Sequence, residues 1–261
     1  MKKSIKIILK TLIFFILWLV LAVVIPIPNG ISDNWWRFLA ELVPFLAIVF
    51  LTYIFSKFEK DRLSILHFEN PIKQTLAGIL LGLIWFFIPF LLLNSLGYFE
   101  ITDKNYINML SIWIVSAFIN TIMQELLARG YIYQLLKKEY NIMIATIVST
   151  LLFNFMHGGA FEAGPIAVIN VLTMSLLMTI ILEYTNSLLI PIIMHFIWNV
   201  MGGIIFGTVS LAEDYPHLYN IEITGNTIIS GGIFKMEGSI FVFIINIVMI
   251  IIFYNLYKKN K

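Results

Sequence analysis

Long apolar stretches with almost no charge dominate this sequence and limit what it can fold into. Eight can be marked, each near the length of about 20 residues that a membrane-spanning helix needs. They cover residues 8–27, 35–56, 74–97, 108–136, 141–158, 163–184, 187–207 and 238–257. None alternates like a transmembrane barrel strand, and in hydrocarbon an α-helix satisfies its own backbone hydrogen bonds. The sequence therefore predicts an all-α, polytopic membrane protein with about eight transmembrane helices.

The overall composition agrees with this prediction. Of the 261 residues, 60% are hydrophobic and 12% are charged, whereas a soluble domain has about 25% charged residues. Because so few charges cannot cover a water-facing surface, a soluble globular enzyme, a disordered tail and a coiled coil are excluded. The net charge of +2 is too small to indicate a nucleic-acid partner, so the lipid bilayer is the expected environment. With no cysteine in the chain, disulfides and a cysteine nucleophile are also excluded.

The basic residues predict how the helices cross the membrane, since cytoplasmic segments are enriched in Lys and Arg. With the N-terminus in the cytoplasm, Arg37, Lys104 and Lys235 fall outside and Arg129 lies within a span. The rest of the 17 Lys and Arg residues then fall on the cytoplasmic side. An even number of spans places the C-terminus there too. The first apolar run is interpreted as an uncleaved span, and the Ile, Asn and Lys bias favours a bacterial plasma membrane.

The chain is expected to have three parts. Residues 1–107 hold the first three transmembrane helices, residues 108–207 form a core of helices four to seven, and residues 208–261 supply an outer loop and the eighth helix. The stretch 63–73 fits either an interfacial helix or the start of the third span.

A few ionisable side chains interrupt the apolar spans, where they are costly and mark a functional site or a buried pair. Glu125 and Arg129 are four residues apart on the fourth span, as are His195 and Asn199 on the seventh, so each pair shares a helix face. His157 ends the fifth span. At about 1.5 Å of rise per residue, the three helices bring these groups to a similar depth. This agreement predicts a polar site within the membrane.

Simpler interpretations exist for each group taken alone. Glu125 and Arg129 could be a buried ion pair that joins helices, and His157 could be an interfacial histidine. His195 could make ordinary interhelical hydrogen bonds. The shared order, spacing and depth favour a common site over three separate structural roles. Structural roles are expected for four further polar residues: Glu41, His67, Glu183 and His217.

Three short motifs contain these residues: Gln-Glu-Leu-Leu-Ala-Arg at 124–129, Phe-Asn-Phe-Met-His at 153–157 and His-Phe-Ile-Trp-Asn at 195–199. In these motifs the chain resembles the CPBP family of intramembrane proteases, also called the CAAX-protease or Abi family. The family pattern is Glu-Glu-x-x-x-Arg, then Phe-x-x-x-His, then His-x-x-x-Asn. The glycines at 231–232 and the Glu-Gly-Ser at 237–239 also look like bacterial members.

The resemblance implies an eight-helix fold with a cavity open toward the cytoplasm, and peptide-bond hydrolysis without a covalent intermediate. It implies that His195 helps to hold the attacking water and that His157 and Asn199 face the oxyanion. It also implies that Arg129 holds Glu125 in place. Phe153 is the remaining motif residue and is expected to support the site.

The family resemblance also raises the question of a metalloprotease. A catalytic zinc ion usually has three protein ligands and one open position. Glu125, His157 and His195 could bind zinc or another divalent metal, although their spacing lacks the His-Glu-x-x-His pattern of helical zinc proteases.

One position departs from the family pattern, because the first Glu of the pair is Gln124 here. A carboxamide does not accept a proton near neutral pH, and the loss of a general base costs about 10²–10⁴-fold in rate. Glu125 is adjacent, but one step along a helix turns a side chain by about 100°. His195 is therefore the best remaining base at neutral pH.

These features predict an intramembrane endopeptidase that cuts a membrane-associated peptide or protein, of the peptide-processing, bacteriocin-processing or immunity type. Water would be activated at a Glu/His/His/Asn site. The alternative is a catalytically impaired pseudoprotease that acts as a membrane scaffold or regulator, and Gln124 motivates it. A transporter with a polar midplane site is a third interpretation, but the chain lacks paired interrupted helices in two matching halves.

Overall fold

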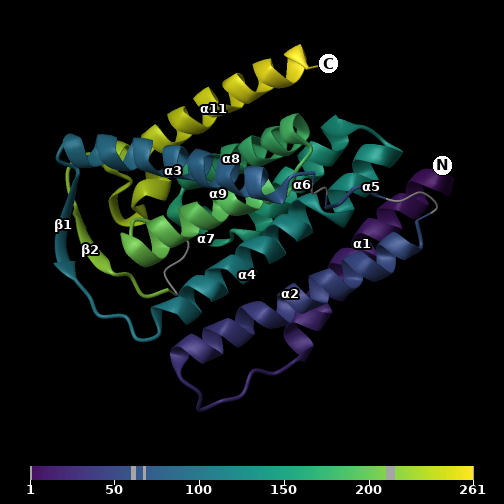
Figure 1. Cartoon of the computed structure of the whole chain (residues 1–261), viewed down its shortest axis with the longest axis horizontal. Helices are drawn as coiled ribbons and strands as arrows, with labels where there is room; N and C mark the ends of the chain where they lie inside the picture. The colour runs from purple at the N-terminus through teal and green to yellow at the C-terminus, as the bar shows by residue number, and fades with distance from the viewer. Residues whose placement is uncertain (1, 60–62, 67–68, 210–214, 261) are drawn as a thin grey trace. The chain divides into compact units, whose positions relative to one another are not determined.

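A computed structural model describes residues 2–59, 63–66, 69–209 and 215–260, which are mostly helical (Figure 1). The longer helices are α1 (Lys2–Val24), α2 (Asp33–Lys57), α3 (Pro71–Ser95), α4 (Leu110–Arg129), α5 (Tyr131–Glu139), α6 (Ile142–Met156), α8 (Pro165–Thr185), α9 (Leu189–Asn199) and α11 (Ile240–Lys259). The shorter elements are α7 (Gly159–Ala163), α10 (Thr227–Ser230), the π-helix η1 (Val200–Ile205), the 3₁₀ turns η3 (Gly232–Phe234) and η4 (Met236–Gly238), and the strands β1 (Phe99–Lys104) and β2 (Tyr219–Ile223).

Within the described ranges, six helices are long and apolar enough to cross a membrane. They are Ser4–Val24, Asp33–Lys57, Pro71–Ser95, Leu110–Glu139, Pro165–Thr185 and Ile240–Lys259. Two shorter apolar helices, Ile142–Met156 and Leu189–Ile205, coincide with the fifth and seventh predicted spans. The prediction of an all-α, polytopic membrane protein is therefore confirmed.

Helix ends follow local chemistry. Helix α3 begins at Pro71, and the Asn70 side chain caps it by accepting a hydrogen bond from the Lys73 backbone N–H at 3.0 Å. The last part of the stretch 63–73 is thus the start of the third span, and residues 63–66 are not helical. Helices α8 and α9 are separated at Asn186, which has the left-handed φ of 50° that asparagine tolerates.

The fourth predicted span differs from the expectation of one continuous helix. The chain forms α4 and α5 with a break at Gly130. A Cβ atom at Gly130 would collide with the carbonyl oxygen of Leu126, so this bend requires glycine. The break places Arg129 in the last turn of α4, directly before the change in direction.

The chain divides into two compact units, and the first comprises Met1–His67 and Ser111–Thr150. In this unit α1 packs on α2, and both contact α5. Aromatic rings fill the contact: Phe14 stacks on Tyr131 with ring centroids 4.8 Å apart, and Phe55 meets Tyr131 edge-on at 5.4 Å. The Trp18 indole N–H donates to the Pro44 carbonyl oxygen at 3.1 Å.

The second unit comprises Phe68–Leu110 and Leu151–Lys261. Here α3 packs against α9, and α8 packs against α11. Two glycines let α3 approach α9 closely, as small residues commonly do between membrane helices. A Cβ atom at Gly78 would lie 2.7 Å from the Ile193 Cβ, and one at Gly82 would lie 2.9 Å from the Ile197 Cβ.

A short antiparallel pair of strands also belongs to the second unit. Strand β1 pairs with β2, with Phe99 opposite Ile223 and an irregularity between Ile101 and Lys104. The sequence analysis did not predict these strands. Thr102 on β1 donates to the carbonyl oxygen of Asn220 on β2, 118 positions later, so only the tertiary structure brings the strands together.

Candidate functional site

The first motif lies on α4 in the first unit, where Glu125 and Arg129 form a buried ion pair. The Arg129 Nη1 donates to the Glu125 Oε2 at 2.8 Å, and both side chains are 0% exposed. Four-residue spacing on one helix makes this contact possible. Removal of either partner would leave an unpaired charge in a low-dielectric interior, which costs free energy. The ion pair therefore holds both side chains in one position.

Gln124 belongs to a different network, which links α4 to α2. Its Nε2 donates to the Asn120 Oδ1 at 2.9 Å, and the Asn120 Nδ2 donates to the Glu41 Oε2 at 2.6 Å. Arg37 pairs with the other oxygen of Glu41 at 2.9 Å. An ionised carboxylate only accepts hydrogen bonds, so Asn120 must turn its amino group to Glu41 and its oxygen to Gln124.

This network determines how the Gln124 amide is oriented. Its nitrogen is used by Asn120, and its Oε1 is buried without a hydrogen-bond partner among the described residues. Position 124 therefore presents an acceptor, which can orient a water but cannot take its proton. Asn120 was missed by the sequence analysis. Its spacing of four residues before Gln124 on an apolar helix was the available signal.

The second and third motifs lie in the second unit. His157 follows directly after the end of α6, and its Nδ1 lies 2.8 Å from the Phe153 carbonyl oxygen. Because a carbonyl oxygen can only accept, Nδ1 carries the proton. Nε2 then accepts a hydrogen bond when the ring is neutral and donates one when the ring is charged.

Phe153 brings the two motif histidines together. Its ring is fully buried and stacks on His157, with centroids 4.3 Å apart and an interplanar angle of 30°. The same ring lies 5.6 Å from the His195 ring at 58°. The centroids of His157 and His195 are 6.2 Å apart, and His195 is 1% exposed. The end of α6 and the middle of α9 thus place two imidazoles around one aromatic ring.

Asn199 is the last residue of α9, one turn after His195 and half-buried. The wider turns of η1 begin at the next residue. Short π-helical segments inside helices occur frequently at functional sites. Gly202 lies within this segment, where a Cβ atom would collide with the Val209 side chain. The change in helix geometry directly after Asn199 therefore depends on a close contact that only glycine permits.

The described part of the chain contains no group of three or more His, Asp or Glu side chains arranged to hold a metal ion. The ligand set Glu125, His157 and His195 stays a prediction from the sequence.

Comparison with known families gives a match over the region that holds these motifs. The family described as type II CAAX prenyl endopeptidase Rce1-like matches residues 106–201, less than half of the chain. No curated protein and no solved structure matches. All three motifs lie within the matched range, and the resemblance predicted from them is confirmed.

Proposed function

We propose, on the premise that the core of this chain belongs to the CAAX prenyl endopeptidase family, that the protein is an intramembrane endopeptidase. It cuts a membrane-associated peptide or protein, of the peptide-processing, bacteriocin-processing or immunity type. The observation that carries this proposal is the cluster of His157 and His195 around Phe153. His195 is buried and His157 is half-buried, and together the two imidazoles provide both an acceptor and a donor of protons for the hydrolysis of an amide bond.

His195 acts as the general base. It accepts a proton from a water molecule as the water oxygen attacks the carbonyl carbon of the scissile bond. It then gives this proton to the nitrogen of the leaving amine. An imidazole nitrogen can accept a proton and return it, so it can do both in one turnover. Gln124 cannot take this proton, because a carboxamide is not a base near neutral pH.

His157 and Asn199 stabilise the oxyanion that forms on the carbonyl oxygen. The Asn199 side-chain amide is a donor in every protonation state. His157 already donates from Nδ1 to the Phe153 carbonyl, so it can donate from Nε2 only as an imidazolium. Loss of a single oxyanion donor typically costs about 10²–10³-fold in kcat. Arg129 and Glu125 hold α4 in shape through their ion pair.

The decisive test uses the full chain in lipid nanodiscs with a broad panel of fluorogenic peptides, both prenylated and unprenylated. We expect cleavage by the wild type and a loss of about 10²–10⁴-fold in His195→Ala. The control is His217→Ala, which removes a histidine that lies outside the three motifs and contacts Asn220. If the wild type cuts no better than His195→Ala, the enzyme proposal is wrong.

The second candidate function is a pseudoprotease that binds membrane proteins as a scaffold or regulator. The specific observation in its favour is the amide at position 124, with its nitrogen engaged by Asn120. Gln124→Glu discriminates the two functions. A silent wild type that gains about 10²–10⁴-fold in cleavage supports the pseudoprotease. Partner capture that survives both His157→Ala and His195→Ala points the same way.

A further inference from the structure

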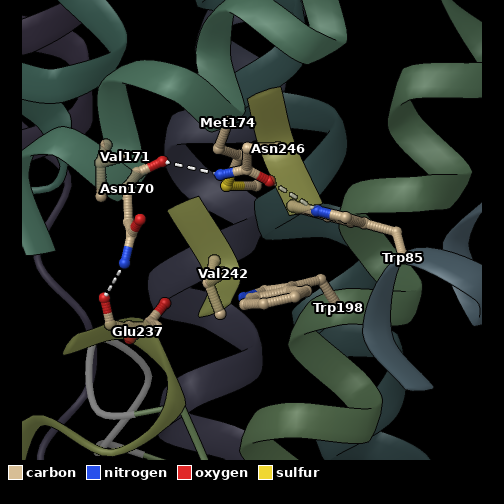
Figure 2. A pocket seen from close by; sticks show the side chains of 8 residues that line it. All are labelled: Trp85, Asn170, Val171, Met174, Trp198, Glu237, Val242 and Asn246. Atoms are coloured by element: carbon tan, nitrogen blue, oxygen red, sulfur yellow. Dashed lines mark hydrogen bonds between the residues drawn. The ribbon is translucent and has the colours of Figure 1, made fainter. Parts of the chain in front are cut away.

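A small cavity lies within the second unit, and Trp198 is the one motif residue that lines it (Figure 2). Helices α3, α8, α9 and α11 surround it, and the turn η4 closes one side. The lining residues are Trp85, Asn170, Val171, Met174, Trp198, Glu237, Val242 and Asn246. The Glu-Gly-Ser segment at 237–239 contributes Glu237 to the wall of this cavity and has no role in the proposed hydrolysis.

Asn170 on α8 fixes the loop that forms one wall. Its Nδ2 donates to the Glu237 carbonyl oxygen at 2.7 Å and to the Ser239 carbonyl oxygen at 3.0 Å. The loop reaches this position through a turn at Gly231, which has a φ of 85°. A Cβ atom there would collide with the Lys235 carbonyl oxygen, so the turn requires glycine.

Asn246 on α11 fixes the opposite wall. Its Nδ2 donates to the Thr173 Oγ1 at 2.9 Å and to the Asn170 carbonyl oxygen at 3.3 Å. Its Oδ1 accepts from the Trp85 Nε1 at 2.7 Å. Trp85 in turn stacks on Trp198 with ring centroids 4.3 Å apart. The indole rings of Trp85 and Trp198, which form this wall, are therefore held in place by a buried chain of satisfied hydrogen bonds.

One acceptor in this cavity is not satisfied. The Asn170 side-chain amino group donates hydrogen bonds to the loop at 237–239. Its Oδ1 is buried without a hydrogen-bond partner within the described ranges. The residue is only 4% exposed. Buried polar atoms nearly always have a partner, which can be water or a ligand. The oxygen therefore calls for a donor group that enters the cavity.

The side chains around the Asn170 Oδ1 indicate the charge of the donor group that would enter the cavity. The Glu237 side chain lines the same cavity, and Figure 2 shows it directed toward Val242 and Trp198. A carboxylate accepts hydrogen bonds and attracts a positive charge, as does the face of an indole ring. A small cation with several N–H donors fits such walls, whereas an anion does not. A primary ammonium is the common biological group of this kind.

We propose that this cavity binds a primary ammonium group of the peptide substrate, as a lysine side chain or a free N-terminus. This assignment to a peptide rests on the proposed function. Trp198 is adjacent to Asn199 and three residues from His195, which is about 4.5 Å along a helix axis. A peptide held by its amine at Trp198 thus lies beside the side chains proposed for hydrolysis.

Binding is tested with the full chain in phosphatidylcholine nanodiscs, using n-butylammonium as the probe and n-butanol as its neutral counterpart. The readouts are tryptophan fluorescence and the midpoint of thermal unfolding. We expect a saturable response to n-butylammonium and none to n-butanol. Glu237→Gln should weaken binding by about tenfold, which corresponds to 1.4 kcal/mol. Glu237→Asp should restore it in part, and Glu222→Gln, at an exposed position on β2, is the matched control.

Equal responses to the two probes, or unchanged binding in Glu237→Gln, would overturn the ammonium site. Neither readout requires cleavage, so this result is separate from the test of the proposed function. Cleaved peptides in which norleucine replaces lysine should show a raised KM and an unchanged kcat. If phosphatidylethanolamine displaces n-butylammonium and the lysine and norleucine peptides behave alike, the group is a lipid headgroup and the peptide assignment is wrong.

Discussion

The two units hold their buried polar side chains in different ways. In the first unit, Glu125 and Arg129 are charged, and each is the ion-pair partner of the other on the same helix. In the second unit, His157 and His195 are placed by the ring of Phe153 and come from different helices. A full charge in an apolar interior needs a counter-charge close in the sequence or in space. An imidazole can be positioned by ring packing together with a backbone hydrogen bond, as His157 is, so its environment depends on the fold.

This contrast predicts which kind of substitution each unit tolerates. The polar site of the first unit should depend on charge and respond weakly to changes in shape. The site of the second unit should depend on the shape of its neighbours. Four substitutions, each with a matched control, test the contrast in order of expected effect.

The largest effect is expected for Arg129→Met. It leaves the Glu125 carboxylate buried without its guanidinium partner, so the free energy of unfolding should fall by about 3–5 kcal/mol. Denaturant unfolding in detergent, followed by circular dichroism, measures the loss. The control is Arg37→Met, because the Arg37 side chain is 17% exposed whereas the Arg129 side chain is 0% exposed. Restored stability in the double variant Glu125→Leu/Arg129→Met would support a dependence on charge in the first unit. A single variant as stable as the wild type would contradict it.

A smaller loss is expected for Gly82→Ala in the second unit. The added Cβ would lie 2.9 Å from the Ile197 Cβ and 3.1 Å from the Met194 Cα, so α9 must move away from α3. Overpacking of this kind costs about 1–3 kcal/mol. The same unfolding assay applies, and Gly158→Ala is the control, because a Cβ there meets nothing within 4 Å. Equal stability of the two variants would contradict the close approach of the helices.

Phe153→Leu tests positioning by packing more directly. The lost ring contacts should lower stability by about 0.5–1.5 kcal/mol. Because both histidines lose the ring that orients them, kcat should fall while KM stays unchanged. The control is Phe155→Leu on the same helix, whose side chain is 66% exposed. A change in KM alone would show that Phe153 serves substrate binding instead.

The smallest effect is expected at Glu59 in the first unit, which follows α2. Burial raises the pKa of this carboxyl, but hydrogen bonds from Lys10 and Tyr131, both at 2.6 Å, outweigh burial and hold the pKa below its ordinary 4.5. A lowered pKa adds stability above pH 4.5, and this stability is lost as the pH falls through the folded-state value.

Glu59→Gln should remove this pH dependence and lower stability at neutral pH by about 1 kcal/mol or less. Thermal unfolding between pH 3 and pH 7 measures both changes, in steps of about half a unit across the range where carboxyls titrate. The control is Glu100→Gln, at an exposed position on β1. A wild type and a Glu59→Gln variant with parallel pH profiles would show that the ion pair adds no stability.

Much of the fold could be predicted from local sequence. Each of the eight apolar stretches corresponds to an apolar helix, because burial in hydrocarbon requires such runs wherever a helix crosses. The break at Gly130 was not predicted, since glycine within a membrane helix is common and its local cost is small. The strands β1 and β2 were not predicted either, because their pairing depends on residues far apart in the sequence.

The candidate site also has one part that local sequence predicts and another part that depends on residues far apart in the sequence. The pair of Glu125 and Arg129 could be predicted from four-residue spacing, because both partners lie on one helix. The network from Gln124 through Asn120 to Glu41 could not, because it joins α4 to a helix some 80 residues earlier. Sequence spacing also says nothing of which nitrogen of His157 faces the Phe153 carbonyl.

The sequence by itself determined the class of protein, its helical spans, its three motifs and the substitution of Gln at position 124. These depend on hydropathy and on spacing within a single helix, which are local properties. Only the tertiary structure decided that Phe153 places His157 beside His195 and that Asn170 has a buried acceptor in a cavity walled by Trp85 and Trp198. Contacts of this kind arise when helices pack, and close packing is set by the shapes of both partners at once.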